Sequence, residues 1–184
     1  MLIGIISDTH GSTRAWLDAI NGPFRGVEQI WHCGDVLYHG ARNPLPAGYN
    51  TQELFELINS CSIPIKAVRG NCDSDVDQMV LDIVLQDPYF MAELPFGRAL
   101  VTHGHHYGPD IMEAMIQRFQ ITLWVSGHIH EPVLQRLGDT IFLNPGSPAL
   151  PKGREQRRSV ALLTDTSVEL HDLDKGQVFA RLDF

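Results

Sequence analysis

The chain has 184 residues, of which 43% are hydrophobic and 20% charged, a composition typical of folded globular proteins and unlike that of disordered chains. The 14 basic and 22 acidic residues give a formal net charge of −8. This balance argues against a protein that binds the nucleic-acid backbone, because such proteins usually present a basic face. The length predicts one domain spanning residues 1–184.

The first half of the chain alternates short apolar stretches with amphipathic ones, a pattern that favours α/β structure. Strands are predicted over residues 2–7, 28–33 and 64–69, and helices over residues 12–20 and 51–60. Residues 38–50 are rich in glycine and proline and predict an ordered loop. Long loops in compact domains often carry function, so this loop is a candidate part of a site.

The second half of the chain is richer in strand-like stretches. A hairpin is predicted over residues 90–94 and 98–102, a helix over 110–119, and strands over 121–126, 133–137, 140–143, 159–164, 168–172 and 178–183. Gly138-Asp139 predicts a hairpin turn. Together the two halves predict two packed sheets with helices outside them.

Five short polar clusters each follow a predicted strand. They are Asp8-Thr9-His10, Gly34-Asp35, Gly70-Asn71-Cys72-Asp73, His103-Gly104-His105 and Gly127-His128-Ile129-His130. Ligands of α/β sheets bind beyond the carboxyl ends of the strands, so we expect these clusters to converge in space. In an extended segment, residues i and i+2 point to the same side, which predicts that Asp8 and His10 face one point.

The clusters contain side chains that ligate metals through oxygen and nitrogen. They offer two carboxylates, one amide and four imidazoles, namely Asp8, His10, Asp35, Asn71, His103, His128 and His130. Mixed nitrogen and oxygen ligands without a thiolate suit manganese, iron or zinc. Seven ligands complete two four-coordinate sites if one carboxylate is shared, and hydrolases with paired ions are built in this way.

In this order, the five motifs resemble those of the calcineurin-type metallophosphoesterase superfamily. Residues 34–40, 42–46, 69–73 and 144–153 are similar to its YfcE-type phosphodiesterases. The resemblance implies a four-layer α-β-β-α sandwich of two mixed sheets flanked by helices. It also implies two divalent transition-metal ions, with manganese as first choice and zinc, iron, nickel or cobalt as alternatives. The implied reaction is hydrolysis of small phosphodiesters by a hydroxide that bridges the two ions.

The resemblance assigns each candidate ligand to an ion. It implies that Asp8, His10, Asp35 and His130 hold the first ion, and that Asp35, Asn71, His103 and His128 hold the second. Two positions depart from the superfamily pattern: Tyr38 stands where an aspartate is frequent, and Cys72 stands where a histidine is usual. That histidine commonly assists phosphomonoester hydrolysis, so the resemblance implies a variant site, and the YfcE-type subgroup shares the cysteine.

Other polar residues have a structural and a functional interpretation. Further catalytic candidates are Cys72, Asp73 and His39, and candidates for substrate binding are Arg42 and His105. Asp73 is placed to orient a metal ligand, and contact with the ligands or with solvent is the simpler role for His39 and His105. Lys152, Arg154, Arg157 and Arg158 form a basic cluster that is either a solvated loop or an additional phosphate-binding element. His32 and His171, together with the tryptophans Trp16, Trp31 and Trp124, are predicted to be structural.

Three alternatives to a small-molecule phosphodiesterase stay open. One is a protein-interaction scaffold with the same fold, as in the retromer subunit, although all seven ligand positions here have competent side chains. The others are a phosphomonoesterase and a nuclease, and the acidic charge disfavours the nuclease. The start of the chain does not look like a signal peptide, no apolar run approaches the ~20 residues of a membrane span, and the three cysteines are sparse. We therefore expect a cytoplasmic protein with no membrane partner, and homo-oligomer formation stays open.

Overall fold

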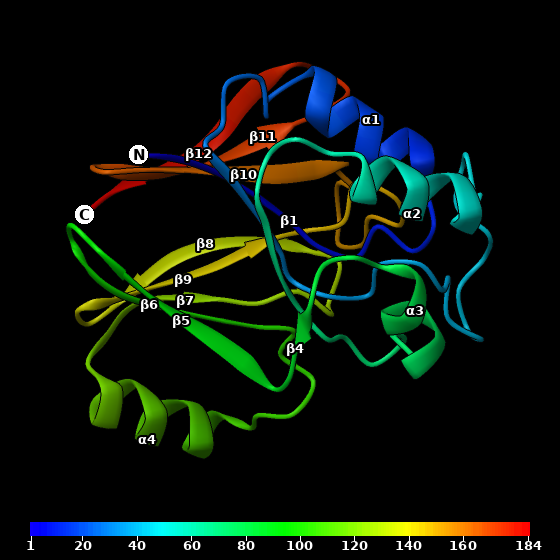
Figure 1. The fold of residues 1–184 in the computed structure, drawn as a ribbon. Helices are drawn as coiled ribbons and strands as arrows, with labels where there is room; N and C mark the ends of the chain where they lie inside the picture. The colour runs from blue at the N-terminus through cyan, green and yellow to red at the C-terminus, as the bar shows by residue number, and fades with distance from the viewer.

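The computed structural model describes residues 1–184 and consists of two β-sheets packed face to face, with helices on the outer faces (Figure 1). The helices are α1 (Thr13–Asn21), α2 (Thr51–Asn59), α3 (Asp75–Val80) and α4 (Pro109–Phe119). The strands are β1 (Leu2–Ile6), β2 (Gln29–His32), β3 (Ile65–Val68), β4 (Leu85–Gln86), β5 (Tyr89–Leu94), β6 (Gly97–Thr102), β7 (Ile121–Val125), β8 (Pro132–Leu137), β9 (Thr140–Pro145), β10 (Ser159–Thr164), β11 (Ser167–Asp172) and β12 (Gln177–Asp183).

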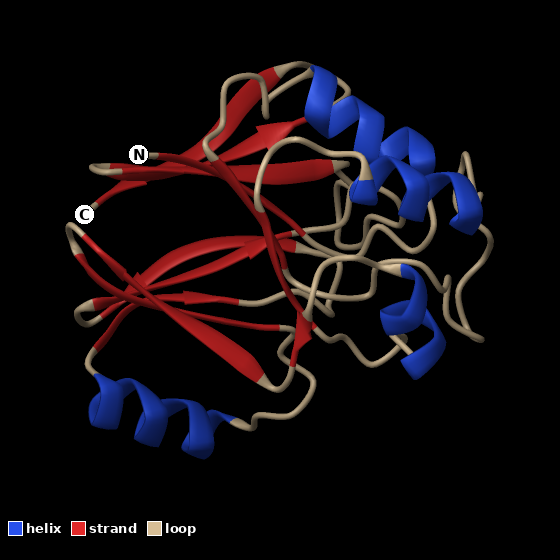
Figure 2. Ribbon diagram, viewed as in Figure 1, coloured by secondary structure: helices blue, strands red, loops and turns tan.

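Both sheets are mixed. The larger one has the order β12-β11-β10-β1-β2-β3-β4, with parallel pairing from β1 to β4 and antiparallel pairing from β1 to β12. The smaller one has the order β5-β6-β7-β9-β8, in which β6, β7 and β9 are parallel and both edge strands are antiparallel. Figure 2 shows the strands inside and the helices outside, which confirms the predicted α-β-β-α sandwich.

Alternating side chains of β1 explain the layering. Ile3 and Ile5 belong to the core between the two sheets, whereas Ile6 belongs to the core beneath α1 and α2. Because successive strand residues point to opposite faces, one apolar strand serves both layers. Across the sheets, the rings of Trp31 and Phe90 meet edge to face with centroids 5.5 Å apart. All three tryptophans are buried, as predicted.

One region differs from the sequence-based expectation. No element was expected between residues 74 and 89, yet α3 and β4 lie there. None of the residues of α3 is buried, and its six residues are too few for the apolar Val76, Met79 and Val80 to establish a recognisable helical period. It is stabilised instead by a capping box, in which the side chains of Ser74 and Asp77 each accept a backbone N–H of the other residue. The expected turn at Gly138-Asp139 does join β8 to β9.

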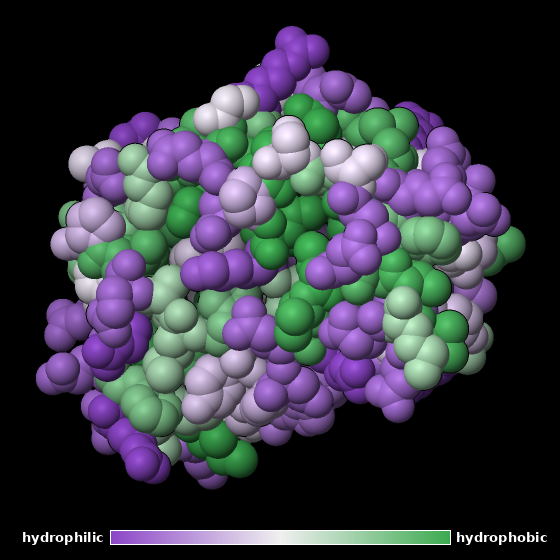
Figure 3. All heavy atoms as spheres, viewed as in Figure 1, coloured by the Kyte–Doolittle hydropathy of each residue, from purple (hydrophilic) through white to green (hydrophobic).

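The surface of the molecule is mixed in polarity. In Figure 3, polar and charged side chains predominate at the rim of the view, and hydrophobic ones show toward its middle. Val76 and Met79 of α3 are among the exposed hydrophobic residues. None of the helices has the length and apolar composition needed to cross a membrane.

Candidate metal centre

The five polar clusters follow β1, β2, β3, β6 and β7, and the structure brings them together on the side of the sandwich opposite the two chain termini (Figure 1). Contacts between the clusters cross from one sheet to the other. The Nδ1–H of His103, after β6, donates to the carbonyl oxygen of Cys33, after β2, at 2.7 Å. The backbone N–H of His128, after β7, donates to a carboxylate oxygen of Asp8, after β1, at 3.0 Å. The predicted convergence is therefore present.

Asp8, His10 and His130 form the first group of candidate ligands. The Nε2 atoms of His10 and His130 are 3.1 Å apart, and the Nε2 of His130 is 3.3 Å from Asp8 Oδ1. Two ligands about 2.1 Å from one ion are roughly 3.0–3.4 Å apart at angles of 90–109°, so these spacings fit a shared ion. All three side chains are almost completely buried.

Hydrogen bonds to backbone carbonyls fix how both imidazoles are oriented. The Nδ1–H of His10 donates to the oxygen of Tyr38, and the Nδ1–H of His130 donates to that of Leu150, each at 2.8 Å. In the neutral rings, both Nε2 atoms then carry lone pairs that face one another. Asp8 Oδ1, which is buried beside them, has no hydrogen-bond partner. Three lone pairs converging on one buried point are repulsive unless a cation lies between them.

The backbone at the candidate ligands is not extended, contrary to the expectation for Asp8 and His10. Positive φ angles occur at five of the seven candidate ligands: Asp8, His10, Asp35, His128 and His130. Left-handed backbone is uncommon for residues other than glycine and clusters at functional sites, where the surrounding structure maintains it. Pairing of β1 ends at Ile6, so the chain turns immediately afterwards, and this turn brings Asp8 and His10 to the same point.

Asp35 lies between the first group and the second. Its Oδ2 is 3.7 Å from His10 Nε2 and 3.4 Å from His103 Nε2. His103 Nε2 is also 3.1 Å from Asn71 Oδ1, and the ring of His128 packs against that of His103 with centroids 5.2 Å apart. Asn71 and His128 are exposed, so the second group is more open than the first.

Strong electrostatic coupling accompanies this geometry. Burial lowers the pKa of His103, but the hydrogen bond with Asp35 and the charges of Asp8 and Asp35 together outweigh burial and raise that pKa to about 9. Burial raises the pKa of Asp35, but His103, the backbone N–H of Cys72 and His10 together outweigh burial and hold the pKa of this carboxyl below its usual range. The two carboxylates therefore create a negative potential at the imidazoles, which favours a bound cation.

Asp73 supports the candidate ligands from behind, as expected. Its two carboxylate oxygens accept the backbone N–H groups of Asp35, Val36 and Gly70 at 2.7–2.8 Å. Burial raises the pKa of Asp73 to about 6, although these hydrogen bonds oppose the shift. Asp73 therefore joins the loop after β2 to the loop after β3.

Cys72 faces the centre directly. Its sulfur lies within 4.8 Å of ligand atoms of His10 and Asp35, and its backbone N–H donates to Asp35 Oδ1 at 2.8 Å. Burial, with Asp35 as the next cause, raises the pKa of the Cys72 thiol to about 12. At neutral pH the side chain is therefore an uncharged thiol.

A cavity of about 1000 Å³ opens over the centre, lined by Asp35, Asn71, Cys72, His128 and His130. Arg42 and Lys152 contribute positive charge to its walls, and Tyr38, the departure from the superfamily pattern, also lines it.

Two of the weaker candidates lie elsewhere. His39 is outside this cavity, with its Nδ1 3.4 Å from the hydroxyl of Tyr49. His105 packs against the rings of His103 and His128 rather than lining the cavity. Its Nδ1 is buried without a partner, and burial, aided by the charge of His103, lowers its pKa to about 4. His32 is structural, as predicted: its ring is buried between Thr9 and the backbone N–H of Gly34.

Several groups that shape the centre could not be recognised from the sequence. The carbonyl oxygens of Cys33, Tyr38 and Leu150 orient three imidazoles, but every residue carries a carbonyl group and no side chain marks these positions. Ser147 donates its hydroxyl to the carbonyl oxygen of Asp8 at 2.7 Å from 139 residues away. Lys152 belonged to a recognisable basic cluster, yet only the folded chain shows that it reaches this cavity.

Comparison with known proteins agrees with this geometry. The chain is 39% identical over 155 residues to phosphodiesterase YfcE of Escherichia coli K12, covering 83% of this chain and 82% of the relative. The solved structure of the E. coli YfcE phosphoesterase superposes with a TM-score of 0.89 at 35% identity, covering 99% of this chain and 98% of that one.

A more distant structure shares the fold alone. Wild-type Vps29 of Entamoeba histolytica, solved with zinc, has a TM-score of 0.68 at 19% identity and covers 100% of this chain and 99% of its own. The family description that matches residues 1–167 is the calcineurin-like phosphoesterase superfamily domain. On the strength of that match and of the identity to YfcE, the chain belongs to the calcineurin-like phosphoesterase superfamily.

Proposed function

We propose that the protein is a metal-dependent phosphodiesterase that hydrolyses small phosphodiesters with two divalent transition-metal ions, manganese being the first choice. The relatives named phosphodiesterase support the reaction class. The observation that carries the proposal is the convergence of Asp8 Oδ1 with the bare Nε2 atoms of His10 and His130 at one buried point. A metal cation between the three atoms would satisfy this arrangement, and the nitrogen and oxygen ligands suit manganese, zinc or iron.

The residues divide between two ions. Asp8, His10, Asp35 and His130 would hold the first ion, and Asp35, Asn71, His103 and His128 would hold the second. When bound, the pair supplies Lewis acidity and an activated water for in-line attack on phosphorus. Asp35 is placed to serve both ions, because its Oδ2 lies between the imidazoles of His10 and His103.

The cavity over the centre favours a small anionic substrate. Its volume of about 1000 Å³ is at the upper end of the range of small-molecule sites, and it is open enough to admit a phosphodiester with two arms. Arg42 and Lys152 supply positive charge at its walls, in a protein of net charge −8. Such a local field attracts a phosphate group even though the whole protein is acidic.

Cys72 favours diesters over monoesters. A monoester dianion brings more negative charge to the centre than a diester monoanion, and a cationic imidazole would offset that charge better than a neutral thiol. The raised pKa of the Cys72 thiol keeps it uncharged at neutral pH. The neutral thiol at position 72 therefore makes a phosphomonoesterase the second candidate function.

The test is a metal titration of protein first stripped with a chelator. Hydrolysis of bis(p-nitrophenyl) phosphate should appear as manganese is added and should exceed hydrolysis of p-nitrophenyl phosphate. His130→Ala should abolish most of this activity. His171→Ala is the matched control, because His171 lies on β11 and pairs with Glu169 away from the centre. Metal binding without turnover of either ester would support the scaffold instead, and faster monoester turnover would support a phosphomonoesterase.

A further inference from the structure

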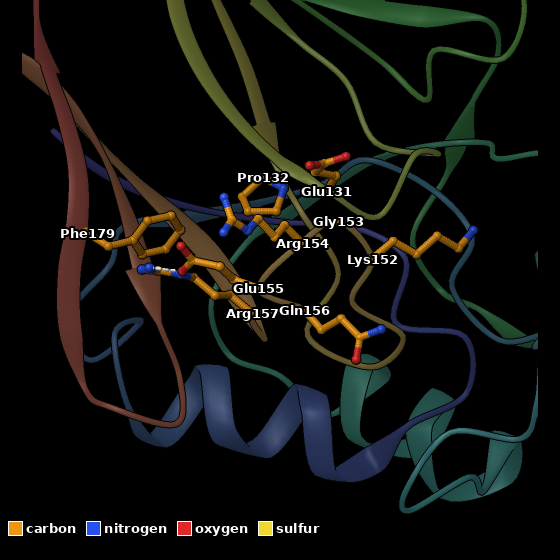
Figure 4. Close-up of a pocket in the computed structure, with 9 residues that line it drawn as sticks. All are labelled: Glu131, Pro132, Lys152, Gly153, Arg154, Glu155, Gln156, Arg157 and Phe179. Atoms are coloured by element: carbon orange, nitrogen blue, oxygen red, sulfur yellow. Dashed lines mark hydrogen bonds and ion pairs between the residues drawn. The ribbon is translucent and has the colours of Figure 1, made fainter.

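A second cavity, of about 260 Å³, lies beside the metal centre and is called the basic pocket below. Figure 4 shows that it lies between the loop of residues 152–157, the start of β8 and Phe179 on β12. Its lining includes three cationic side chains, Lys152, Arg154 and Arg157, and two carboxylates, Glu131 and Glu155.

The three cations that line the basic pocket outnumber its two carboxylates. Arg157 forms an ion pair with Glu155, and its guanidinium lies 4.5 Å from the ring centroid of Phe179. The side chains of Lys152 and Arg154 form no ion pair or hydrogen bond. In Figure 4, Arg154 and Arg157 extend to the same side of the loop, toward Phe179, whereas Lys152 extends to the opposite side.

The loop that carries these cations is attached directly to the metal centre. The backbone N–H of Lys152 donates to the carbonyl oxygen of the candidate ligand His130 at 3.0 Å. Gly153 packs so closely on Glu131 that a Cβ there would be 2.5 Å from the Glu131 carboxylate. At the far end, Arg158 donates to the carboxylates of Asp18 and Asp174. Both ends are therefore fixed, and the backbone that carries the cations in between is held at a set place relative to the centre.

The basic pocket adjoins the cavity over the metal centre, because Lys152 contributes to the lining of both. A phosphodiester has two arms, and an arm that leaves the centre past Lys152 is the part of the substrate that would meet the unpaired guanidinium of Arg154. Guanidinium groups bind phosphate through paired N–H donors, and the contact of Arg157 with Phe179 holds a second such group in place.

We propose that the basic pocket is an anion subsite that selects phosphodiesters carrying a further anionic group, such as a terminal phosphate, on one arm. This inference rests on the proposed phosphodiesterase function, because it names the class of substrate that the metal centre would cleave. It assigns Arg154 as a specificity-determining residue that contacts the additional anion. Lys152 serves both cavities, and Arg157 completes the subsite.

The experiment uses two substrates that differ by one phosphate. They are p-nitrophenyl thymidine 5′-phosphate and the same compound with a 3′-phosphate. In the metal-loaded wild-type protein, kcat/KM should be higher for the 3′-phosphorylated compound. Arg154→Gln should lower the ratio of the two kcat/KM values about tenfold, through loss of a charge-assisted contact that solvent partly screens. Arg154→Lys should retain part of the preference, because it keeps the charge but not the fork of donors.

Arg25→Gln is the matched control, because Arg25 is an exposed residue between α1 and β2 and the same charge is removed there. It should leave the ratio unchanged. An equal fall with Arg25→Gln would show a general charge effect and overturn the subsite. An unchanged ratio in Arg154→Gln would overturn it as well.

A binding measurement separates failure of the subsite from failure of the proposed function. Calorimetry of the metal-loaded protein compares thymidine 3′,5′-bisphosphate with thymidine 5′-monophosphate. The bisphosphate should bind about tenfold more tightly to the wild-type protein, and Arg154→Gln should remove most of that difference. If neither chromogenic substrate is cleaved but this difference holds, the phosphodiesterase proposal fails and the anion subsite stands. Equal affinity for both nucleotides overturns the subsite whatever the turnover.

Discussion

The two halves of the metal centre differ in how completely the folded chain prepares them. Asp8 and His10 are 0% exposed and His130 is 3% exposed, and both imidazoles are oriented by backbone carbonyls. In the other half, Asn71 and His128 are exposed, and the Nδ2 of Asn71 donates to the sulfur of Cys72. The first half is thus buried and oriented throughout, whereas the second combines the buried His103, oriented by the carbonyl oxygen of Cys33, with two exposed ligands.

This contrast concerns the free-energy cost of the centre in the absence of a metal ion. Burying three lone pairs at one point costs free energy in the absence of a cation, and left-handed backbone at Asp8, His10 and His130 adds strain. Ion binding removes the first of these costs, so the first half should bind more tightly and should fill first. The second half faces the cavity, where an exposed ion is also available to substrate.

Asp35→Asn is the change with the largest expected effect, because Asp35 is the one side chain assigned to both halves. Loss of a residue that merely supports a metal ligand costs about 10–100-fold, so loss of a shared ligand should lower kcat/KM for a diester by about 10³-fold or more. Elemental analysis should show both ions depleted. Asp139→Asn, in the exposed turn between β8 and β9, is the control. Unchanged metal content in Asp35→Asn would disprove the bridging role.

A pair of alanine variants tests the contrast directly. His10→Ala removes a buried, oriented ligand and should weaken the tighter ion by about 100-fold, whereas His128→Ala should weaken only the looser ion, by about tenfold. Stepwise metal titration with calorimetry measures both affinities. If the two variants weaken the same binding step equally, the halves do not differ in the way proposed here.

The third prediction concerns His32, which supports the first half through Thr9 and Gly34. Burial lowers the pKa of His32 to about 4, against 6.5 for a free imidazole. Between these pH values the unfolded chain binds a proton that the folded chain does not, so stability falls as pH falls from 6.5 to 4. From the size of the pKa shift, protonation of His32 in the unfolded chain lowers the free energy of unfolding by about 2–3 kcal/mol at pH 4.

Urea unfolding with a chelator present, at several pH values, checks this prediction. The free energy of unfolding of His32→Gln should decline less steeply below pH 6.5 than that of the wild-type protein, although it starts lower because contacts with Thr9 and Gly34 are lost. Parallel curves for the two proteins would show that His32 titrates normally.

Much of this centre was accessible from the sequence because its chemistry lies in side chains at the ends of recognisable strands. Asp8 and Asp35 follow apolar runs that could form only buried strands, and parallel strands bring their carboxyl ends together. The runs also predicted two packed sheets with helices outside, and the resemblance to the superfamily implied the four-layer arrangement. The sequence therefore predicts well those features of the centre that depend on the type of side chain at a strand end.

The remainder depends on backbone geometry and on distant contacts, which leave no local signal. The alternation of Asp8 and His10 predicted extended chain, whereas both are left-handed, and their backbone N–H groups donate to carbonyl oxygens of Gly34 and Asp35 in the loop after β2. The helix α3 has only six residues, too few for a recognisable apolar period. Lys152 reaches the cavity only because residues 152–158 are fixed at both ends.

Cys72→His carries the smallest expected effect and tests the open side of the centre. The thiol, with its pKa raised to about 12, is a weak neutral donor, whereas an imidazolium donates a proton to a leaving oxygen and offsets the second charge of a monoester. A well-placed general acid contributes about 10²–10⁴-fold, but a ring that replaces a thiol beside Asp35 will not align fully, so about three- to tenfold is expected.

The quantity to compare is the ratio of kcat/KM for p-nitrophenyl phosphate to that for bis(p-nitrophenyl) phosphate, at saturating metal. It should rise in Cys72→His, with metal content unchanged. Cys61→His is the control, because Cys61 packs at the edge of the core under α2, away from the cavity.

The nitrophenolate leaving group needs little protonation, so a rise with these esters would arise mainly from charge. A further rise with an alkyl leaving group would identify proton donation. If neither ratio changes while both ions stay bound, residue 72 does not set the preference for diesters over monoesters. The positive charge of Arg42 and Lys152 on the cavity walls is then the next candidate determinant.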